Sequence, residues 1–201
     1  MKENSDGDSL ELGPIGPNAE PPMVTSTVHE VTRTYLEVSS RQQLVPGQST
    51  GTVATLDRIA PCTVEQWRAL YRQIGAPWHW HDRDTWSDDS LAAHLARPDV
   101  QVFRVTADLG PEWPEAAGFL ELERHGDGSV EIAYLGLDQR VLGRRLGSWL
   151  VVQAVETAFN WGANRIWLHT CTLDAAAALP NYLARGFRIL RVETYCTTML
   201  A

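Results

Sequence analysis

Polar and apolar residues alternate near the start of the chain. In residues 28–38, VHEVTRTYLEV, β-branched or aromatic residues alternate with polar ones, a pattern typical of a half-buried strand. A loop with Pro46 and Gly47 follows, and residues 52–59 then form a short apolar stretch. We therefore expect a strand at residues 28–38 and a second strand, at a sheet edge, around residues 52–59.

Two helices are predicted next. Thr63 is a suitable N-cap for a helix over residues 64–74 that Gly75 would end. Ser87 is a suitable N-cap for a second helix, which Pro98 would stop. Between the two helices runs a dense aromatic and polar connection, APWHWHDRDTW, at residues 76–86.

Strands and helices follow one another through the rest of the chain. Residues 100–107, 116–124 and 129–137 read as three strands separated by turns rich in Gly, Pro and Asp, and they predict an antiparallel meander. A long amphipathic helix at about residues 143–161 precedes a buried strand at residues 165–170. Asp174 can cap a last helix over residues 175–185, which Pro180 would kink or divide. Residues 187–197 read as the last strand.

Length and composition fit one globular domain with a tail. Of the 201 residues, 44% are hydrophobic and 21% are charged, a mixture that excludes a wholly disordered, collagen-like or coiled-coil chain. Residues 1–22 hold five acids and almost nothing to bury, so they predict a disordered acidic tail. Residues 23–201 are expected to form the domain.

Charge and cysteine content narrow the classes of partner. The net charge is −8, and half of it belongs to residues 1–22, so a nucleic-acid or anionic-membrane surface is disfavoured. No apolar run is long enough to span a membrane. Cys62, Cys171 and Cys196 form no CxxC pair and have no zinc-ligand spacing. They favour reduced thiols in the cytoplasm and no metal site.

Anion-binding features gather where a predicted strand runs into a helix. Residues 131–150, EIAYLGLDQRVLGRRLGSWL, join the two through a loop with Gly143 and Gly147. Backbone N–H groups at a helix N-terminus attract anions, and glycines let an anion approach closely. Arg140, Arg144 and Arg145 add positive charge. Neither GxxxxGK(S/T) nor GxGxxG is present, so the pattern implies a pyrophosphate other than that of a nucleoside triphosphate or a dinucleotide.

Four segments together resemble the core of the GNAT superfamily of acyl-CoA N-acyltransferases. They are the strand EIAYLGL, the loop and helix VLGRRLGSWLV, the strand RIWLHT and the terminal NYLARGF, in the expected order over about residues 115–197. The resemblance implies a single α/β domain of the α+β type. Its mixed, mainly antiparallel sheet would have six or seven strands, splayed at the centre, with about four helices. The resemblance also implies acetyl-CoA as co-substrate and no metal.

The same resemblance implies a binding site for coenzyme A. The superfamily pattern of the loop is Q/R-x-x-G-x-G/A, and here Leu142 stands in place of Gln or Arg and Arg145 in place of the middle glycine. The residues that would hold the pyrophosphate are Leu142, Gly143, Arg144, Arg145, Leu146, Gly147 and Ser148. The pantetheine arm would lie in the splay, along an edge formed by Tyr134, Leu135, Gly136 and Leu137.

Two catalytic residues are implied in the same way. Glu131 lies on the strand where some members carry the general base, and a carboxylate with a raised pKa in an apolar cleft can take a proton from an amine. Tyr182 matches the tyrosine of Y-x-x-x-G-F, whose hydroxyl would protonate the departing thiolate. The alternatives are a solvent-facing carboxylate at a strand end and a tyrosine packed in the core.

The aromatic connection at residues 76–86 lies where the superfamily usually places part of its acceptor site. Trp78 and Trp80 would flank or cage the acceptor, and Asp82 would recognise its ammonium group. His169 would orient the substrate or relay a proton. The alternatives are a Trp-rich loop that seals the core and a hydrogen-bonded core histidine.

Taken together, these features predict an N-acetyltransferase that moves an acetyl group from acetyl-CoA to the primary amine of a small molecule by direct attack. A protein or peptide amine is the second enzymatic interpretation. A non-catalytic acyl-CoA-binding regulatory module is the alternative of another class. We expect no nucleic-acid or membrane partner, and the formation of a homodimer is left open.

Overall fold

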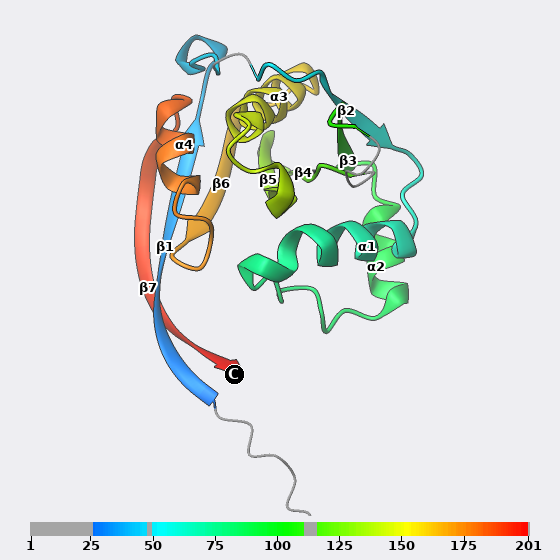
Figure 1. Ribbon diagram of the computed structural model, residues 1–201, viewed down its shortest axis with the longest axis vertical. Helices are drawn as coiled ribbons and strands as arrows, with labels where there is room; N and C mark the ends of the chain where they lie inside the picture. Colours follow the sequence, from blue (N-terminus) through cyan, green and yellow to red (C-terminus); the bar gives the residue numbers. More distant parts are fainter. Residues whose placement is uncertain (1–25, 48–49, 111–115, 201) are drawn as a thin grey trace, which may run out of the picture.

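In the described part of the chain, seven strands form one sheet, in the order β2-β3-β4-β5-β6-β1-β7 (Figure 1). The computed structural model describes residues 26–47, 50–110 and 116–200, so the predicted tail at residues 1–22 lies outside the described residues. The strands are β1 Ser26–Val38, β2 Ala54–Ile59, β3 Val100–Ala107, β4 Gly118–Arg124, β5 Ser129–Leu137, β6 Arg165–Cys171 and β7 Arg188–Leu200. The predicted α/β architecture is confirmed.

The predicted meander is present and includes a fourth strand. β2 pairs with β3, β3 with β4 and β4 with β5, each in antiparallel fashion, and β2 lies at a sheet edge as expected. β5 and β6 pair in parallel. A parallel pair needs a crossover connection, and the helix α3, Leu146–Asn160, provides it.

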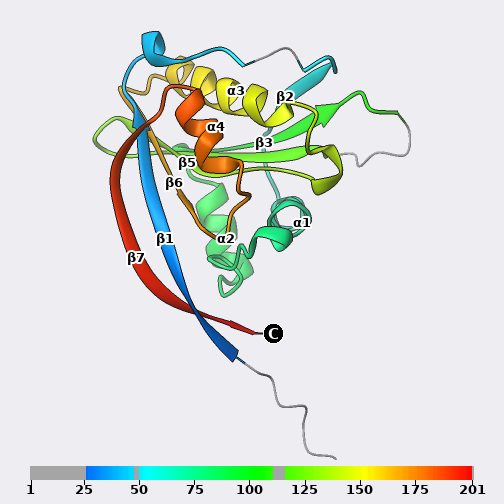
Figure 2. The same ribbon diagram turned by 60° about the vertical axis from the view of Figure 1, so that its left-hand side comes forward.

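The N-terminal strand β1 lies between β6 and β7. It is antiparallel to both, with Arg33 opposite Cys171 on β6 and Ser26 opposite Leu200 on β7. Beyond the end of β6, β1 and β7 continue as a two-stranded ribbon that extends away from the rest of the sheet (Figures 1 and 2). Among the described strands, β7 is therefore joined to the sheet through β1 alone.

Two helices cover each face of the sheet (Figure 2). α1, Val64–Gly75, and α2, Asp88–Leu95, lie on one face, and α3 and α4, Ala178–Ala184, lie on the other. Both predicted N-caps are present, because the Thr63 side chain accepts a hydrogen bond from the N–H of Gln66 and the Ser87 side chain from that of Ser90. Short 3-10 turns, Arg41–Gln43, Ala76–Trp78 and Gln139–Val141, complete the described elements.

Apolar side chains fill the space between sheet and helices on both faces. The core under α3 and α4 includes Leu122 and Val155, and the core under α1 and α2 includes Trp67 and Phe119. All four are fully buried. Burying an apolar side chain of this size contributes about 1.5–3 kcal/mol, so the two cores hold each helix pair against the sheet.

The last helix differs from its prediction. α4 begins at Ala178, and its N-cap position is Ala177, which provides no side-chain cap. Asp174 instead accepts hydrogen bonds from the Thr170 hydroxyl at 2.6 Å and the Cys171 N–H at 2.9 Å, closing the turn after β6. Pro180 then falls in the first turn of the helix, where a missing N–H leaves no intrahelical bond unmade. The expected kink is therefore avoided by a later start.

Candidate active site

β5 and β6 separate over half of their length. Their parallel pairing joins residues 129–131 to residues 165–167, and beyond Glu131 no further pair forms between them within the described residues. β4 follows β5 to its end, with a register shift after Glu121 that leaves Ala133 as the extra residue. Tyr134, Leu135, Gly136 and Leu137 therefore have backbone groups that face the opening between β5 and β6.

Gly136 brings the helix α1 close to this open edge. A Cβ at Gly136 would lie 2.5 Å from Cγ2 of Ile74 and 3.1 Å from the Trp80 ring. The Trp80 ring also packs against Tyr71 and Tyr134, with ring centroids 5.8 Å and 5.0 Å away. Trp80 thus forms a wall of the opening on the α1 side.

The glycine loop lies at the end of β5, where α3 begins. Gly143 has φ of +78° and Arg145, the N-cap of α3, has φ of +63°. No side chain caps this helix start, although the first N–H groups of a helix have no acceptor within it. Gly143, Arg144 and Arg145 line a cavity of about 320 Å³ together with Thr50 and Gly51. The loop is an open, donor-rich site for an anion.

Asp138 fixes the segment that leads into this loop. Its carboxylate accepts hydrogen bonds from the N–H and Nε of Arg140 at 2.9 and 2.8 Å, and from Nε2 of Gln73 at 2.9 Å. The hydrogen bonds from Arg140 hold the pKa of the Asp138 carboxyl well below its usual range. Arg140, which the sequence placed with the loop arginines, therefore serves the buried Asp138.

Tyr182 lies on α4, which packs beside α3. Its side chain is buried and packs edge-on to Phe187, with ring centroids 5.8 Å apart. The neighbouring Asn181 points toward the loop, since a Cβ at Gly147 would lie 3.7 Å from its Nδ2. Burial raises the pKa of the Tyr182 phenol, and the charge of Asp174 raises it further. The hydroxyl therefore stays protonated throughout the neutral range.

The side chain of Glu131 lies on the face of β5 that is opposite to the core under α3 and α4. Its neighbours Val130 and Ile132 belong to the core under α3 and α4, so its side chain points to the face that α1 and α2 cover. Oε2 of Glu131 is 3.1 Å from Nε2 of His125, and 17% of the side chain is exposed. Burial raises the pKa of the Glu131 carboxyl, while the hydrogen bond from His125 opposes that shift.

The predicted acceptor residues lie on this same face. Trp78 is half-buried, and Asp82 is exposed. His169 is exposed on β6 and meets Tyr35 of β1 edge-on, with ring centroids 5.7 Å apart. Although its ring surface is exposed, partial desolvation by the surrounding protein lowers the pKa of His169, and the charge of Arg33 lowers it further.

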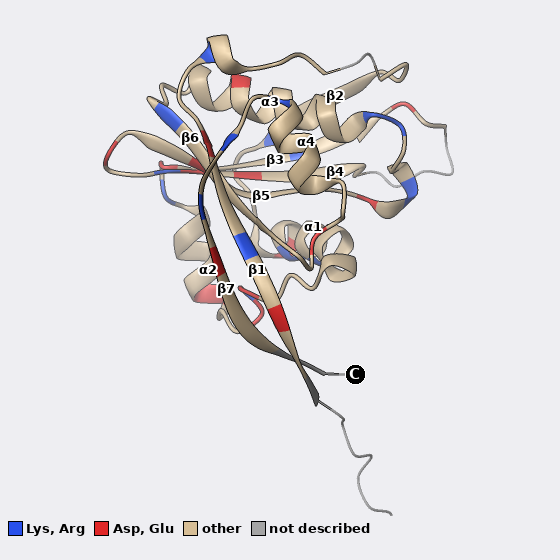
Figure 3. Ribbon diagram, turned by 90° about the vertical axis from the view of Figure 1, so that its left-hand side faces the viewer, with Lys and Arg blue, Asp and Glu red and all other residues tan. Residues whose placement is uncertain are grey.

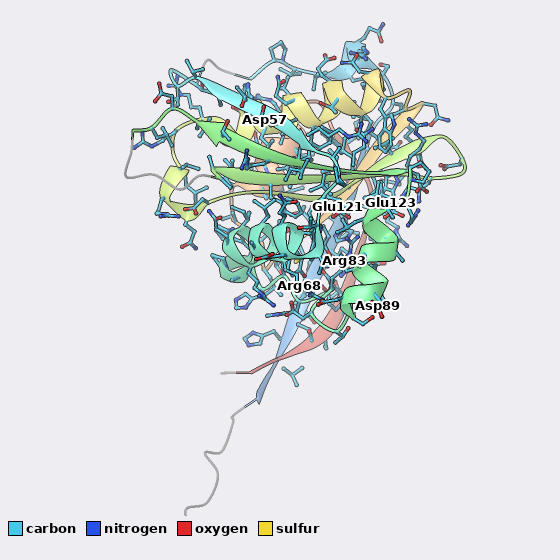
Figure 4. The ribbon with its side chains drawn as sticks, turned by 90° about the vertical axis from the view of Figure 1, so that its right-hand side faces the viewer. Asp57, Arg68, Arg83, Asp89, Glu121 and Glu123 are labelled. Carbon is cyan, nitrogen blue, oxygen red and sulfur yellow. The ribbon has the colours of Figure 1, made fainter. Side chains whose placement is uncertain are left out.

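A buried ion pair that the sequence analysis missed anchors the aromatic connection (Figure 4). Glu121 on β4 is fully buried and accepts hydrogen bonds from Nη1 of Arg83 at 2.6 Å and Nε1 of Trp67 at 2.5 Å. Nε2 of His94 lies 2.9 Å from the same carboxylate. Burial alone would raise the pKa of Glu121, but the hydrogen bond with His94 and the charge of Arg83 lower it. A buried acid needs such partners. This requirement was the signal by which sequence reasoning could have sought partners for Glu121.

The structure contains an aromatic cage, but it is not the one predicted at Trp78 and Trp80, and it holds the protein's own Arg83. The Arg83 guanidinium lies 4.8 Å from the Trp86 ring centroid, 4.9 Å from that of Tyr134 and 5.4 Å from that of Trp67. Trp80 borders a separate cavity of about 290 Å³ on the α1 side, whose lining residues are Arg68, Tyr71, Arg72, Ala76, Trp80, His81 and Asp84, and Asp82 is not among them. The Trp-rich connection therefore both seals the core and borders an open cavity.

In the ranges that the structure describes, no group of three His, Cys, Asp or Glu side chains is placed to hold a metal ion. In the same part of the chain, no helix is long and apolar enough to cross a membrane.

Comparisons with known proteins cover the part of the chain that holds β5, α3, β6 and α4. A family profile described as "Acetyltransferase (GNAT) family" matches residues 64–187. No curated protein matches the sequence. Solved structures do match the fold. A GCN5-related N-acetyltransferase from Kribbella flavida is 19% identical with a TM-score of 0.53, over 87% of this chain and 59% of that one. One from Sphaerobacter thermophilus is 13% identical with a TM-score of 0.59, over 85% and 51%.

A third structure has a stated substrate class. It is an aminoglycoside acetyltransferase from an uncultured soil metagenomic sample, solved in complex with trehalose. Its sequence is 15% identical and its TM-score is 0.52, over 66% of this chain and 86% of that one. At these identities the likeness concerns the fold. The chain spans little more than half the length of the Kribbella and Sphaerobacter structures.

Proposed function

Because the chain belongs to the GNAT family of acetyltransferases, we propose that it transfers an acetyl group from acetyl-CoA to the primary amine of a small molecule by direct attack. The observation that carries the proposal is the opening between β5 and β6, with the glycine loop of α3 at its end and α4, which carries Tyr182, reaching that loop through Asn181. Residues 23–201 would form the catalytic domain, and residues 1–22 would be a dispensable tail.

The glycine loop would bind the pyrophosphate of the co-substrate. The N–H groups from Gly143 to Ser148 are suited to this because the first turn of α3 has no side-chain cap. Gly143 adds no side chain to the neighbouring cavity of about 320 Å³. The pantetheine arm would follow the open edge of β5 at Tyr134, Leu135, Gly136 and Leu137. Backbone N–H groups near Leu137 would stabilise the oxyanion.

Glu131 would act as the general base, directly or through a water molecule. An amine is mostly protonated at neutral pH and must lose a proton before it can attack a thioester. Burial of the Glu131 carboxyl raises its pKa, and a raised pKa makes the carboxylate a better proton acceptor. The amine nitrogen would form a bond to the carbonyl carbon, and the carbon–sulfur bond would then break.

Tyr182 would donate a proton to the departing thiolate. Its raised pKa keeps the hydroxyl protonated, and its helix α4 contacts the start of α3 through the neighbouring Asn181. The proton gained by Glu131 and the proton lost by Tyr182 balance the reaction, and exchange with water resets both groups.

The acceptor would enter from the face that α1 and α2 cover. Trp78, Trp80, Asp82 and His169 lie on this face, and Trp80 borders both the open edge and the cavity of about 290 Å³. A cavity of this size suits a small molecule. The aminoglycoside acetyltransferase with a similar fold acts on a small amine, which favours this class over a protein amine. Three free cysteines suit a reducing compartment, and we place the protein in the cytoplasm.

Thiol release from acetyl-CoA with a panel of amines tests the proposal. The wild-type protein should release thiol with at least one small amine, and Tyr182→Phe should lower kcat about 100-fold or more while acetyl-CoA still binds. Tyr195→Phe, on the ribbon, is the matched control and should keep full turnover. Binding of acetyl-CoA without turnover of any amine would favour the non-catalytic module, and turnover confined to peptides would favour a protein substrate.

The pH dependence of the rate tests the base. Glu131→Gln should lower kcat/KM about 100-fold or more and remove its rise with pH, because the amide cannot accept the proton. Glu123→Gln is the matched control, since Glu123 lies opposite Glu131 on β4 and pairs with Arg97. The charge of Glu123 helps to raise the pKa of Glu131, so this control should keep kcat and shift the rise toward lower pH. An unchanged profile in Glu131→Gln would assign the base elsewhere.

A further inference from the structure

The outer edge of β7 is unpaired within the described part of the chain. β7 forms hydrogen-bonded pairs with β1 on one side, and it is the last strand of the sheet on the other (Figures 1 and 3). In an antiparallel strand, half of the N–H and C=O groups point away from each neighbour. A long edge strand of this kind is a template for pairing with another chain.

Large apolar side chains gather along one stretch of this edge. Ile189, Leu190 and Val192 of β7 are 51%, 53% and 54% exposed, and Leu183 of the adjoining α4 is 42% exposed. Single exposed apolar residues are ordinary, but a contiguous group of large ones marks a surface that a partner covers. We define the β7 patch as Leu183, Ile189, Leu190 and Val192.

We propose that a second copy of this chain covers the β7 patch, so that two β7 strands pair in antiparallel fashion about a two-fold axis at Val192. A two-fold axis perpendicular to the sheet keeps each side chain on its own face. The pairing of β7 with β1 is irregular between Ile189 and Arg191, and Leu190 is the extra residue there. From Arg191 onward, successive residues point to opposite faces, so facing residues must be separated by an even number of positions. The axis therefore passes through a residue, and that residue faces its own copy.

Charge selects Val192 from the residues that could lie on the axis. With Val192 there, Arg191 of each chain faces Glu193 of its partner, and two opposite-charge pairs form. With the axis at Arg191 or at Glu193, like charges would face each other, which is unfavourable for cross-strand neighbours. The side chains are available for the contact, since Arg191 is 59% and Glu193 39% exposed while 3.5 Å apart within one chain.

The same register also covers apolar surface. Val192, which is 54% exposed, would meet the partner's Val192 on the axis. Residues 1–22 of the same chain are the competing occupant of this edge. They contain Pro14, Pro17, Pro21 and Pro22, which lack the N–H that a paired strand donates, so the second copy is favoured.

Charge reversal tests the register in the full-length chain. Light scattering coupled to size exclusion should find a dimer, and Arg191→Glu should weaken it about tenfold or more because two attractive pairs become repulsive. The double variant Arg191→Glu with Glu193→Arg should restore dimerisation, since the opposite charges face each other again. A monomer at all concentrations would overturn the proposal, as would a double variant no better than the single one. Circular dichroism spectra should be unchanged in each variant.

Cross-linking tests the position of the axis independently. Val192→Cys in a Cys196→Ser background should form a covalent dimer with a short bismaleimide, because a residue on the axis faces its own copy. Val28→Cys in the same background is the control: Val28 is 70% exposed on the same ribbon but far along it from Val192, and should not cross-link. Equal cross-linking at both positions would overturn the proposal. So would a chain that dimerises only after deletion of residues 1–22, because the tail would then be the native occupant.

None of these substitutions touches the proposed catalytic or coenzyme-binding residues, so acetyl transfer per chain should be unchanged. Failure of the proposed function would leave the test of the dimer unaffected.

Discussion

Replacing Arg83 by methionine should destabilise the protein more than any comparable change to a surface arginine. Arg83 is 8% exposed, and it supplies the cationic partner of the fully buried Glu121. Methionine keeps much of the side-chain volume between Trp67, Trp86 and Tyr134 but removes the charge. The Glu121 carboxylate would then remain buried with the Trp67 N–H and His94 as its remaining partners.

The magnitude follows from the cost of an uncompensated buried charge. Removing one partner of a buried ion pair costs about 3–5 kcal/mol. For a domain of this size, each kcal/mol shifts the Tm by about 2–4 °C, so Arg83→Met should lower the Tm by roughly 6–20 °C. The pair Arg83→Met and Glu121→Gln completes a double-mutant cycle. The double variant should lose less stability than the two single variants together, because each single variant leaves one unpaired buried charge and the double variant leaves none.

Urea unfolding, with calorimetry as a second measurement, provides the assay. Arg97→Met is the control, because Arg97 pairs with Asp99 at 2.6 Å while 41% exposed, and exposed pairs contribute at most about 1 kcal/mol. The folded pKa of Glu121 is lowered from 4.5. The stabilisation is therefore present above about pH 4.5 and lost as the pH falls through the folded pKa. An Arg83→Met variant within 1 kcal/mol of Arg97→Met would refute the reasoning.

Other predictions concern the backbone, the glycine loop and the tail. Gly186→Ala should destabilise the protein by more than about 1 kcal/mol, because Gly186 has φ of +99° and a Cβ there would overlap the Gln43 carbonyl. Gly126→Ala is the control: a Cβ at Gly126 would meet nothing within 4 Å. In the same urea titration, this control should leave the stability unchanged. Asp138→Asn should raise the KM for acetyl-CoA several-fold with a smaller effect on kcat, because the carboxylate anchors the segment that leads into the loop. Steady-state kinetics measure both constants. An unchanged KM would show that this anchor does not contribute to coenzyme binding. Deletion of residues 1–22 should leave the Tm and kcat unchanged, and a loss of either would contradict the proposed domain boundary.

Local features were predictable from the sequence because their causes lie within a few residues. Thr63 and Ser87 cap helices through bonds to residues three positions away. The meander follows from alternation within each strand and from the turns between strands. The start of α3 follows from Gly143, whose φ of +78° suits glycine. These elements, with the resemblance of residues 115–197 to a known family, were enough to anticipate the architecture.

The missed features depend on residues that are distant in the sequence. Glu121 looks like one of several strand acids, and its burial follows from the packing of α1 and α2 over that face of β4. His169 follows the alternation of its strand, with Leu168 buried beside it. Its exposure arises because α1 and α2 pack on β3, β4 and β5 rather than on β6. Neither fact is encoded in the residues next to it.

The position of β1 has a consequence for how the chain reaches its fold. β1 precedes the other described strands in the chain, yet both of its partners, β6 and β7, are the last two of these strands. Contacts between such distant residues form slowly, because closing a long loop costs entropy before any pairing compensates it. A β-rich segment with both edges free is also prone to aggregation. A polypeptide growing on the ribosome would therefore hold an unpaired strand through most of its synthesis, and moving β1 behind β7 in a circular permutant should speed folding.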